Sequence, residues 1–380
     1  MRSMRVANRR LCGLSLAAIA GALASPGPAI GQDPPLGSAS STGALAQQPS
    51  AAAPSRSASG SGSAATEATR ASPLEPTTLA SRYPGDAGIE ADPALVWHER
   101  FDEGSVDAIA SRYDSHANVP GMAIVTDRRP AAAGALALQL TAGGAAPATD
   151  LYKSFATGLD EVYLRYYVKY VDAGPWSHSG VSLGGYDPPL QYPFPRAGTR
   201  PSGADRFSIA LEPWSSTADT RLDFYAYWMK MRSWKATPTG AANDFYGNTL
   251  VHDADLRNRA NTWTCYEVHL KLNEDPASGR GAVLELWRDD ALIRRFDDRG
   301  PPGFLNRDEF CANDATGREC TDHRPERTPS TPLDQEWRST LALKINFLWV
   351  QNYNTSAATS ALRVADIVLA TRRIGCMVSP

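Results

Sequence analysis

The stretch Glu161-Val-Tyr-Leu-Arg-Tyr-Tyr-Val-Lys-Tyr-Val171 decides the fold of this 380-residue chain. Apolar residues alternate along it with polar or aromatic ones, and successive residues of a strand point to opposite sides of a sheet. The even-numbered residues from Val162 to Tyr170 are therefore expected to face a core. The odd-numbered residues, Arg165 and Tyr167 among them, are expected on the other face. The pattern predicts a β-strand that covers one side of a hydrophobic core.

Short runs of the same kind recur from Val96 to the C-terminus, between segments rich in Gly, Pro, Asn and Asp. Such runs indicate strands, and no part of this region has the pattern of a long amphipathic helix. Many short strands at near-regular spacing predict one antiparallel β-sandwich or barrel domain. The other runs that predict strands are Ala135–Leu140, Arg206–Glu212, Arg221–Met231, Cys265–Leu272, Val283–Trp287, Ala291–Phe296, Leu341–Val350 and Leu362–Ala370.

Alternation in the run Arg221–Met231 assigns its side chains to two faces. The predicted core set contains Phe224. The opposite face then carries Asp223, Tyr225 and Tyr227. We therefore expect two tyrosine rings and a carboxylate on a common face.

The run Leu341–Val350 alternates in the same way. Strict alternation predicts that Ile345, Phe347 and Trp349 are buried on one face. This leaves Lys344 and Asn346 on the opposite face. Several strands would thus present polar or aromatic groups on their second face. Aromatic rings can stack on sugar rings, and cationic and amide groups can bind hydroxyls or carboxylates. A solvated outer sheet face is the alternative.

The first residues have the order of features that is typical of a signal peptide. Several arginines precede an apolar run from Leu11 to Ala24, which ends in the small-x-small pattern Ala22-Leu23-Ala24. The run is too short to cross a hydrocarbon core of about 30 Å as a helix. We predict that residues 1–24 are cleaved, that the protein is secreted or periplasmic, and that it makes no stable membrane insertion.

Residues 25–90 form a segment dominated by Ala, Ser, Pro, Gly and Thr. Such a segment buries too little apolar surface to offset the backbone entropy lost on ordering, so we predict a disordered linker. Residues 91–380 would then form the folded, carbohydrate-active domain. The net charge of -3 and 21% charged residues argue against a nucleic-acid partner.

Removal of the signal peptide leaves an even number of cysteines, which in an exported protein favours disulfides. Four cysteines allow three pairings. Cys311 and Cys320 bracket a polar loop, so we predict a bridge between them and a second one between Cys265 and Cys376. A metal site made of Cys311, Cys320 and His323 is the alternative, although the spacing matches no common zinc pattern.

Several of these runs resemble the concanavalin A-like jelly rolls, and their layout is most similar to the alginate and glucuronan lyase type of polysaccharide lyase. The resemblance spans most of residues 95–375. It is carried by 161–170, Ser182-Leu-Gly-Gly-Tyr186, Leu222-Asp-Phe-Tyr-Ala-Tyr-Trp228, 263–273, Leu284-Glu-Leu-Trp-Arg-Asp-Asp290 and Asp366-Ile-Val-Leu-Ala370. The resemblance implies an antiparallel jelly-roll β-sandwich that acts on an acidic polysaccharide.

The resemblance also implies a chemistry, β-elimination. A base removes the proton next to a uronic acid carboxylate, and an acid protonates the departing glycosidic oxygen. The Tyr-x-Tyr strand of such lyases is similar to Tyr225-Ala-Tyr227, which makes both tyrosines candidate catalytic residues. Where such lyases carry a lysine before a Gly-rich segment, this chain has His178, in a stretch whose Gly and Pro predict a turn. An ordinary loop histidine is the alternative for His178.

Candidate substrate-binding residues come from the faces assigned above. Cationic and amide side chains would recognise the carboxylate, and the remaining polar residues on the predicted faces would contact hydroxyl groups. They are Arg165, Tyr167, Lys344, Asn346, Asp223 and Glu212. By the same alternation His269 is predicted to lie on the surface.

Two other functions remain open. A glycoside hydrolase needs a pair of carboxyl groups, which Glu212 and Asp223 on neighbouring strands can supply, although no Glu-x-Asp-x-Glu run is present. A binding module without catalysis needs only the aromatic rings. No motif demands a cofactor or metal, a structural calcium ion stays open, and we expect a monomer.

The segment Pro188–Gly203 contains Tyr192, Phe194, Arg196 and Arg200 among several prolines. It joins two predicted strands. We expect it either to cover the sugar-binding face as a lid or to be an ordinary surface loop.

Overall fold

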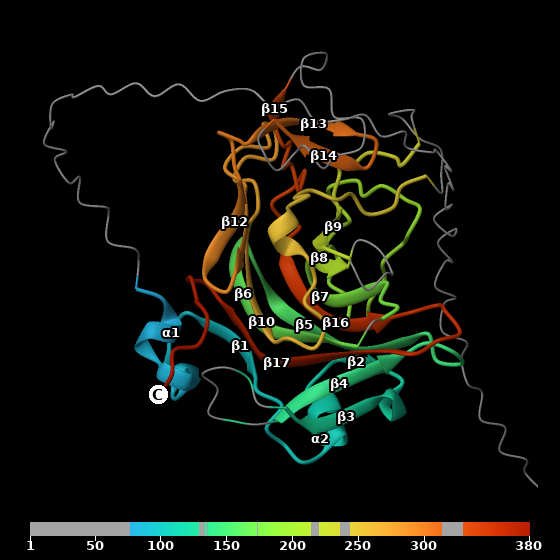
Figure 1. The fold of residues 1–380 in the computed structure, drawn as a ribbon. Helices are drawn as coiled ribbons and strands as arrows, with labels where there is room; N and C mark the ends of the chain where they lie inside the picture. The colour runs from blue at the N-terminus through green and yellow to red at the C-terminus, as the bar shows by residue number, and fades with distance from the viewer. Residues whose placement is uncertain are drawn as a thin grey trace, which may run out of the picture. The chain divides into compact units, whose positions relative to one another are not determined.

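The described part of the chain is a jelly-roll β-sandwich of two large antiparallel sheets with a small third sheet (Figure 1). It comes from a computed structural model that describes residues 77–380 except 128, 130–133, 135, 173, 214–219, 236–243 and 314–329. The predicted all-β antiparallel fold is confirmed. The two α-helices within the described residues are short, the longer one spanning Val106–Ala110.

The larger sheet, here called sheet A, has eight strands within the described residues. In their order of pairing these are β12 (Ala291–Phe296), β11 (Val283–Arg288), β10 (Thr264–Lys271), β6 (Glu161–Val171), β17 (Ser360–Ala370), β4 (Leu136–Ala142) and β3 (Met122–Thr126), with β1 (Leu95–Glu99) pairing with β17.

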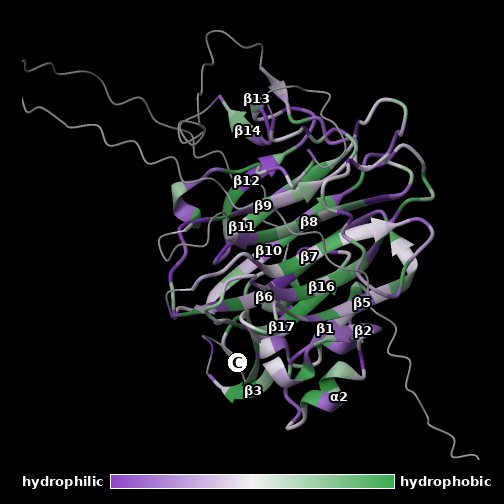
Figure 2. Ribbon diagram, turned by 90° about the vertical axis from the view of Figure 1, so that its right-hand side faces the viewer, coloured by the Kyte–Doolittle hydropathy of each residue, from purple (hydrophilic) through white to green (hydrophobic). Residues whose placement is uncertain are grey.

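The second sheet, here called sheet B, pairs its strands in the order β2 (Ser115–Ala117), β5 (Ala148–Leu159), β16 (Ile345–Tyr353), β7 (His178–Tyr186), β8 (Arg206–Pro213) and β9 (Leu222–Tyr227). Figure 2 shows β5, β16, β7, β8 and β9 side by side in this order. The small sheet consists of β14 (Glu309–Ala312), β13 (Pro302–Asn306) and β15 (Thr331–Pro332).

Short helical turns complete the described secondary structure. They are α1 (Leu79–Arg82), η1 (Pro84–Asp86), η2 (Ile89–Ala91), α2 (Val106–Ala110), η3 (Val119–Gly121) and η4 (Ala254–Leu256). Within the described ranges, no helix combines the length and the apolar composition that crossing a membrane requires.

The hydrophobic core lies between sheets A and B, because one face of each sheet is apolar. In β6 the side chains that belong to this core are the even-numbered ones, from Val162 to Tyr170, as alternation predicts. In β9 the buried set contains Leu222 and Phe224, which again agrees with the prediction. Sheet B adds Leu183 from β7.

Three strands of sheet B, namely β2, β5 and β7, are absent from the runs that predict strands. The segment that becomes β7 contains Gly180, Gly184 and Gly185, and its glycines predicted a turn. These glycines are needed where backbone and rings come close, since a Cβ on Gly184 would lie 2.4 Å from the carbonyl oxygen of Phe207. His178 therefore lies in a strand, and the prediction that it lies in a turn is wrong.

The folded part begins before the predicted boundary at residue 91. The backbone N–H groups of Leu79 and Ala80 donate to the carbonyls of Arg373 and Ile374 at 3.1 and 2.8 Å. Figure 1 shows α1 beside the C-terminal end of the chain. Residues 77–90 therefore belong to the domain. The predicted signal peptide and the rest of the predicted linker lie outside the described residues.

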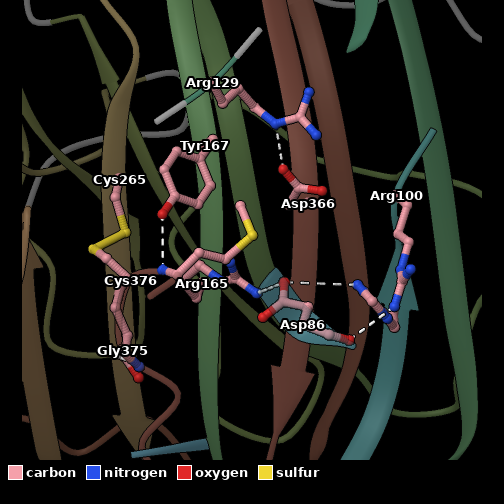
Figure 3. Close-up of polar contacts among 12 residues, drawn as sticks. Asp86, Arg100, Arg129, Arg165, Tyr167, Cys265, Asp366, Gly375 and Cys376 are labelled. Atoms are coloured by element: carbon pink, nitrogen blue, oxygen red, sulfur yellow. Dashed lines mark hydrogen bonds and ion pairs between the residues drawn. A yellow bond between two sulfur atoms is a disulfide. The ribbon is translucent and has the colours of Figure 1, made fainter. Parts of the chain in front are cut away.

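Residues near Asp86 and near Met377 cover Arg165 and Tyr167 on the outer face of sheet A, so these two residues do not form a substrate site there. Arg165 is fully buried and donates to the carboxylate of Asp86 (Figure 3). The hydroxyl of Tyr167 accepts a hydrogen bond from the backbone N–H of Met377 at 2.8 Å. Strand alternation places both side chains outside the core, but it cannot show that another segment of the chain covers them.

The C-terminal segment is held on sheet A by a disulfide bond. Cys265 in β10 is bonded to Cys376, which is the predicted pairing. Cys311 is buried in β14 and forms no disulfide with any described residue. Cys320 and His323 lie outside the described residues, so the bridge between Cys311 and Cys320 stays a prediction.

His269 is buried, and the prediction that it lies on the surface is wrong. Its Nδ1 lies 2.6 Å from Glu285 and its Nε2 2.8 Å from Glu161. Its ring also stacks on Tyr163 with centroids 4.0 Å apart. Burial alone would lower the pKa of His269, but the two carboxylates outweigh this effect and raise it. His269 therefore belongs to a structural ion-pair network.

We predict that Asp86→Ala strongly destabilises the protein, because it leaves the buried guanidinium of Arg165 without its carboxylate. Breaking such a buried pair costs about 3 to 5 kcal/mol in the free energy of unfolding. Urea denaturation measures this loss, and the exposed Asp107→Ala serves as the matched control. The double variant Asp86→Ala/Arg165→Met should recover much of the loss. Equal stability of Asp86→Ala and the control would contradict the interpretation.

Candidate functional site

The face of sheet B that points away from the core is rich in aromatic and polar side chains. The strand registers place alternate residues of five neighbouring strands on it. We call this set the aromatic face. It consists of Asp150 and Tyr152 from β5, Phe347, Trp349, Gln351 and Tyr353 from β16, His178, Gly180, Ser182, Gly184 and Tyr186 from β7, Arg206, Ser208, Ala210 and Glu212 from β8, and Asp223, Tyr225 and Tyr227 from β9.

A β-bulge decides which residues of β16 reach the aromatic face. The register between β16 and β5 shifts between Ile345 and Phe347. Ile345 and Leu348 lie in the main core, whereas Phe347 packs with Tyr152 and Tyr186 outside it. The prediction that Phe347 and Trp349 share a face with Ile345 is wrong, because an extra residue in a strand reverses the alternation.

Four of the predicted site residues meet at one end of the aromatic face. His178 Nδ1 lies 2.6 Å from Oε1 of Glu212, which is buried. The ring of His178 lies 4.9 Å from that of Tyr225, and the hydroxyls of Tyr225 and Tyr227 are 3.4 Å apart. Tyr353, which sequence reasoning missed, adds a ring 5.9 Å from His178. We call His178, Glu212, Tyr225 and Tyr227 the histidine cluster.

Small residues lie between the aromatic side chains of β16 and those of β9. On β7 they are Gly180, Ser182 and Gly184, and on β8 they are Ser208 and Ala210. The rings on both sides therefore stand higher than the residues between them. Aromatic rings next to a row of small residues can stack on the apolar faces of sugar rings.

The loop after β9 covers one side of Tyr225. A Cβ on Gly247 would lie 2.5 Å from the Tyr225 ring, so only glycine allows the backbone to pass there. Asn248 pairs with Ala226 through two backbone hydrogen bonds of 2.9 Å. This contact fixes the ring of Tyr225 next to His178.

Three predicted substrate-binding residues have structural roles instead. Both oxygens of Asp223 accept backbone N–H groups of residues 250–252, at 2.8 to 2.9 Å. The side chain of Asn346 is bonded to the backbone N–H and carbonyl of Tyr186. Lys344 pairs with Asp160 at 2.7 Å beyond the end of β16. Each of the three side chains therefore bonds to another part of the protein itself.

Asp150 is a titratable group on the aromatic face that sequence reasoning missed. It lies in β5, opposite Gln351 of β16. Burial raises the pKa of Asp150 to about 6, although Trp349 and His116 partly oppose this effect. The face can therefore gain a negative charge near neutral pH.

Across the described ranges, no group of three or more His, Cys, Asp or Glu side chains is arranged to hold a metal ion.

No protein-family model and no curated protein sequence matches this chain. Among solved structures, the alginate lyase Aly36B aligns at 13% identity over 75% of this chain and 100% of its own, with a TM-score of 0.46. The marine PL-14 alginate lyase from Aplysia kurodai aligns at 12% identity over 73% and 99%, with a TM-score of 0.46. The endo-β-1,4-glucuronan lyase from the fungus Trichoderma reesei aligns at 10% identity over 73% and 96%, with a TM-score of 0.37.

These alignments are similarities to lyases of the type expected from the sequence, and each has a TM-score below 0.5. Identities of 13% or less carry no residue role and no activity to this chain. Any function has to follow from the geometry of the aromatic face.

We predict that Gly247→Ala displaces the Tyr225 ring, because the new methyl group would overlap it. Overpacking of this kind costs about 1 to 3 kcal/mol in the free energy of unfolding. Urea denaturation measures that loss, and the NMR signals of the Tyr225 ring report the displacement. Gly104→Ala is the control, since a Cβ there meets nothing within 4 Å. Unchanged Tyr225 signals would show that the loop does not fix this ring.

We predict that Asp150→Asn raises stability above pH 6. A carboxyl whose pKa is higher in the folded state binds more protons there, so the wild type loses stability as pH rises from about 4 to about 6. Asparagine does not ionise and escapes this loss, which is at most on the order of 3 kcal/mol. Melting temperatures at pH 4 and pH 8 measure the difference. A gain that is the same at both values would refute the raised pKa.

Proposed function

We propose that this protein binds an acidic polysaccharide across the aromatic face and cleaves it by β-elimination at the histidine cluster. The observation that carries the proposal is the contact of His178 Nδ1 with the buried carboxylate of Glu212, beside Tyr225 and Tyr227. A base held by a carboxylate, next to phenol groups on a sheet face lined with rings, matches what this reaction requires.

His178 is proposed as the base. In this assignment the proton of Nδ1 lies in the contact with Glu212, and Nε2 is the nitrogen proposed to take the proton from the substrate. Glu212 stabilises the imidazolium that forms, as a buried carboxylate behind a catalytic histidine does. The side chain of His178 is 22% exposed, so a substrate on the aromatic face can reach it.

The proton donor and the carboxylate recognition are assigned to neighbouring strands. Tyr225 and Tyr227 present adjacent hydroxyls, and one of them would protonate the departing oxygen. In the pairing of β16 with β7, Tyr353 lies opposite His178. Gln351 is two residues before Tyr353 on the same face of β16, so its side chain lies near His178. Its amide N–H group can donate to the uronate carboxylate, whose charge grows as the proton leaves.

The reaction balances without a cofactor. His178 takes the proton from the carbon next to the carboxylate, and the electrons of that C–H bond form a carbon–carbon double bond. The bond from the adjacent carbon to the glycosidic oxygen breaks, and that oxygen takes a proton from a tyrosine. One product therefore carries an unsaturated uronate at its new end.

The described carboxyl groups argue against a glycoside hydrolase. Asp223, next to Glu212 in the register, is occupied by backbone N–H groups. Asp150 and Glu212 are three strand spacings apart, which is about 14 Å at about 4.8 Å per strand. An inverting hydrolase needs about 6.5 to 9.5 Å and a retaining one about 5 to 5.5 Å.

The same proposal includes export to a secreted or periplasmic location. It is supported by the signal-peptide pattern of residues 1–24 and by the disulfide between Cys265 and Cys376. An extracellular polysaccharide would meet the protein there.

We predict that the wild type cleaves a uronic-acid polymer and forms a product that absorbs as an unsaturated uronate. Alginate and glucuronan are the first polymers to test. His178→Ala should slow cleavage about 10²- to 10⁴-fold, because general base catalysis contributes about that much. Tyr225→Phe and Tyr227→Phe separate the two phenols, since only the proton donor should cause a comparable loss.

Tyr163→Phe is the matched control, because Tyr163 lies on sheet A beside His269. It should leave turnover unchanged. Cleavage that persists in all three site variants would rule out the histidine cluster. New reducing ends without the absorbance would indicate hydrolysis, and binding without cleavage would indicate a carbohydrate-binding module.

A further inference from the structure

We call residues 187–205, the loop between β7 and β8, the rim loop. It is hydrogen-bonded to residues of the aromatic face. The hydroxyl of Tyr152 donates to the carbonyl of Leu190 at 3.2 Å. The backbone N–H of Phe194 donates to the hydroxyl of Tyr186 at 2.9 Å. Two residues of the aromatic face therefore fix the position of the rim loop.

The rim loop also reaches the segment that covers the histidine cluster. Gly198 and Phe245 pair through backbone hydrogen bonds of 2.8 and 3.4 Å. Arg206 of β8 donates to both oxygens of Thr199 at 2.7 Å. Gly247 follows Phe245 by two residues and packs against the ring of Tyr225. The rim loop is thus connected to the proposed site through the segment from Phe245 to Gly247.

The rim loop presents two large rings to solvent. Tyr192 is 51% exposed and Phe194 is 38% exposed. The guanidinium of Arg196 lies 5.5 Å from the centre of the Phe194 ring. Arg196 has φ 50, a conformation that non-glycine residues adopt infrequently and that often marks functional sites. Exposed rings with a stacked cation form a ready surface for a charged sugar.

The charge of Arg196 is only weakly compensated within the described residues. Its closest carboxylate is that of Asp205, at 3.9 Å. Asp205 is already bonded to Arg206 at 2.6 Å and to Ser202 at 2.7 Å. Burial lowers the pKa of Arg206, and the nearby charge of Arg196 acts in the same direction. Two neighbouring guanidiniums favour an incoming carboxylate.

We propose that Tyr192, Phe194 and Arg196 form an outlying subsite for a further uronate unit of the same polysaccharide. The proposal rests on the proposed function. The rings stack on the sugar, and Arg196 binds its carboxylate. A chain long enough to reach from the histidine cluster to the rim loop then binds more tightly than a short one.

The test compares the affinity for long alginate or glucuronan fragments with that for their trisaccharides by titration calorimetry. Tyr192→Ala and Phe194→Ala should each weaken binding of long fragments about 3- to 10-fold, as the loss of a stacked ring does. Trisaccharide affinity should stay unchanged. Arg196→Ala should also reduce the dependence of long-fragment binding on salt.

Leu292→Ala is the matched control, because Leu292 is 51% exposed and lies on β12 of sheet A. If the wild type binds and cleaves a polymer but the rim variants behave like this control, the subsite is wrong and the proposed function stands. If the wild type binds neither polymer, the proposed function fails and the subsite with it. If Tyr192→Ala or Phe194→Ala instead converts a dimer to a monomer in sedimentation, the rings bind a second copy and the subsite is overturned.

Discussion

The aromatic face depends on one irregularity, the bulge at Asn346 in β16. The side-chain amide of Asn346 replaces the ladder hydrogen bonds to Tyr186, at 2.8 and 3.0 Å. Gly185 makes the close approach possible, since a Cβ there would lie 1.9 Å from the carbonyl oxygen of Lys344. An unpaired buried backbone group costs about 1 to 3 kcal/mol, so this single amide fixes the register. Every side chain of β16 after the bulge takes its face from it.

Each of the two large sheets has a histidine that contacts carboxylate and tyrosine side chains, but the two histidines differ in their access to solvent. On sheet A, His269 lies between the carboxylates of Glu285 and Glu161 and stacks on Tyr163. On sheet B, His178 contacts the carboxylate of Glu212 and lies near Tyr225. The difference is access, because the side chain of His269 is 6% exposed and that of His178 is 22% exposed. On the outer face of sheet A, the segments around Asp86 and Met377 lie over Arg165 and Tyr167. Solvent access therefore distinguishes the candidate site from a structural network.

Alternation in the sequence predicted the face of each side chain correctly where strands are regular. The prediction was wrong where a strand contains a bulge or several glycines. Strict alternation correctly predicted the core residues of β6 and, in β9, Leu222 and Phe224. It did not predict that Tyr227 is buried against the core as well. It could not reveal the bulge in β16, so Trp349 was assigned to the core. The glycines of β7 predict a turn and not a strand, whereas His178 is a candidate because of the resemblance to the lyases. Arg165 was assigned to a substrate face, because a local pattern contains no information on which distant segment covers a strand.

The glycines of β7 are unfavourable for the stability of a strand, and their position bears on the candidate site. Glycine in a strand interior costs about 0.5 to 1 kcal/mol relative to alanine, and β7 is central, paired with β16 on one side and β8 on the other. A strand that served only the core would carry β-branched residues on its outer face as well. Instead, Gly180 and Gly184 carry no side chain there, and the ring of Phe347 packs against Gly184. Departures from local preference that lower stability are expected at functional sites, and here they lie beside His178.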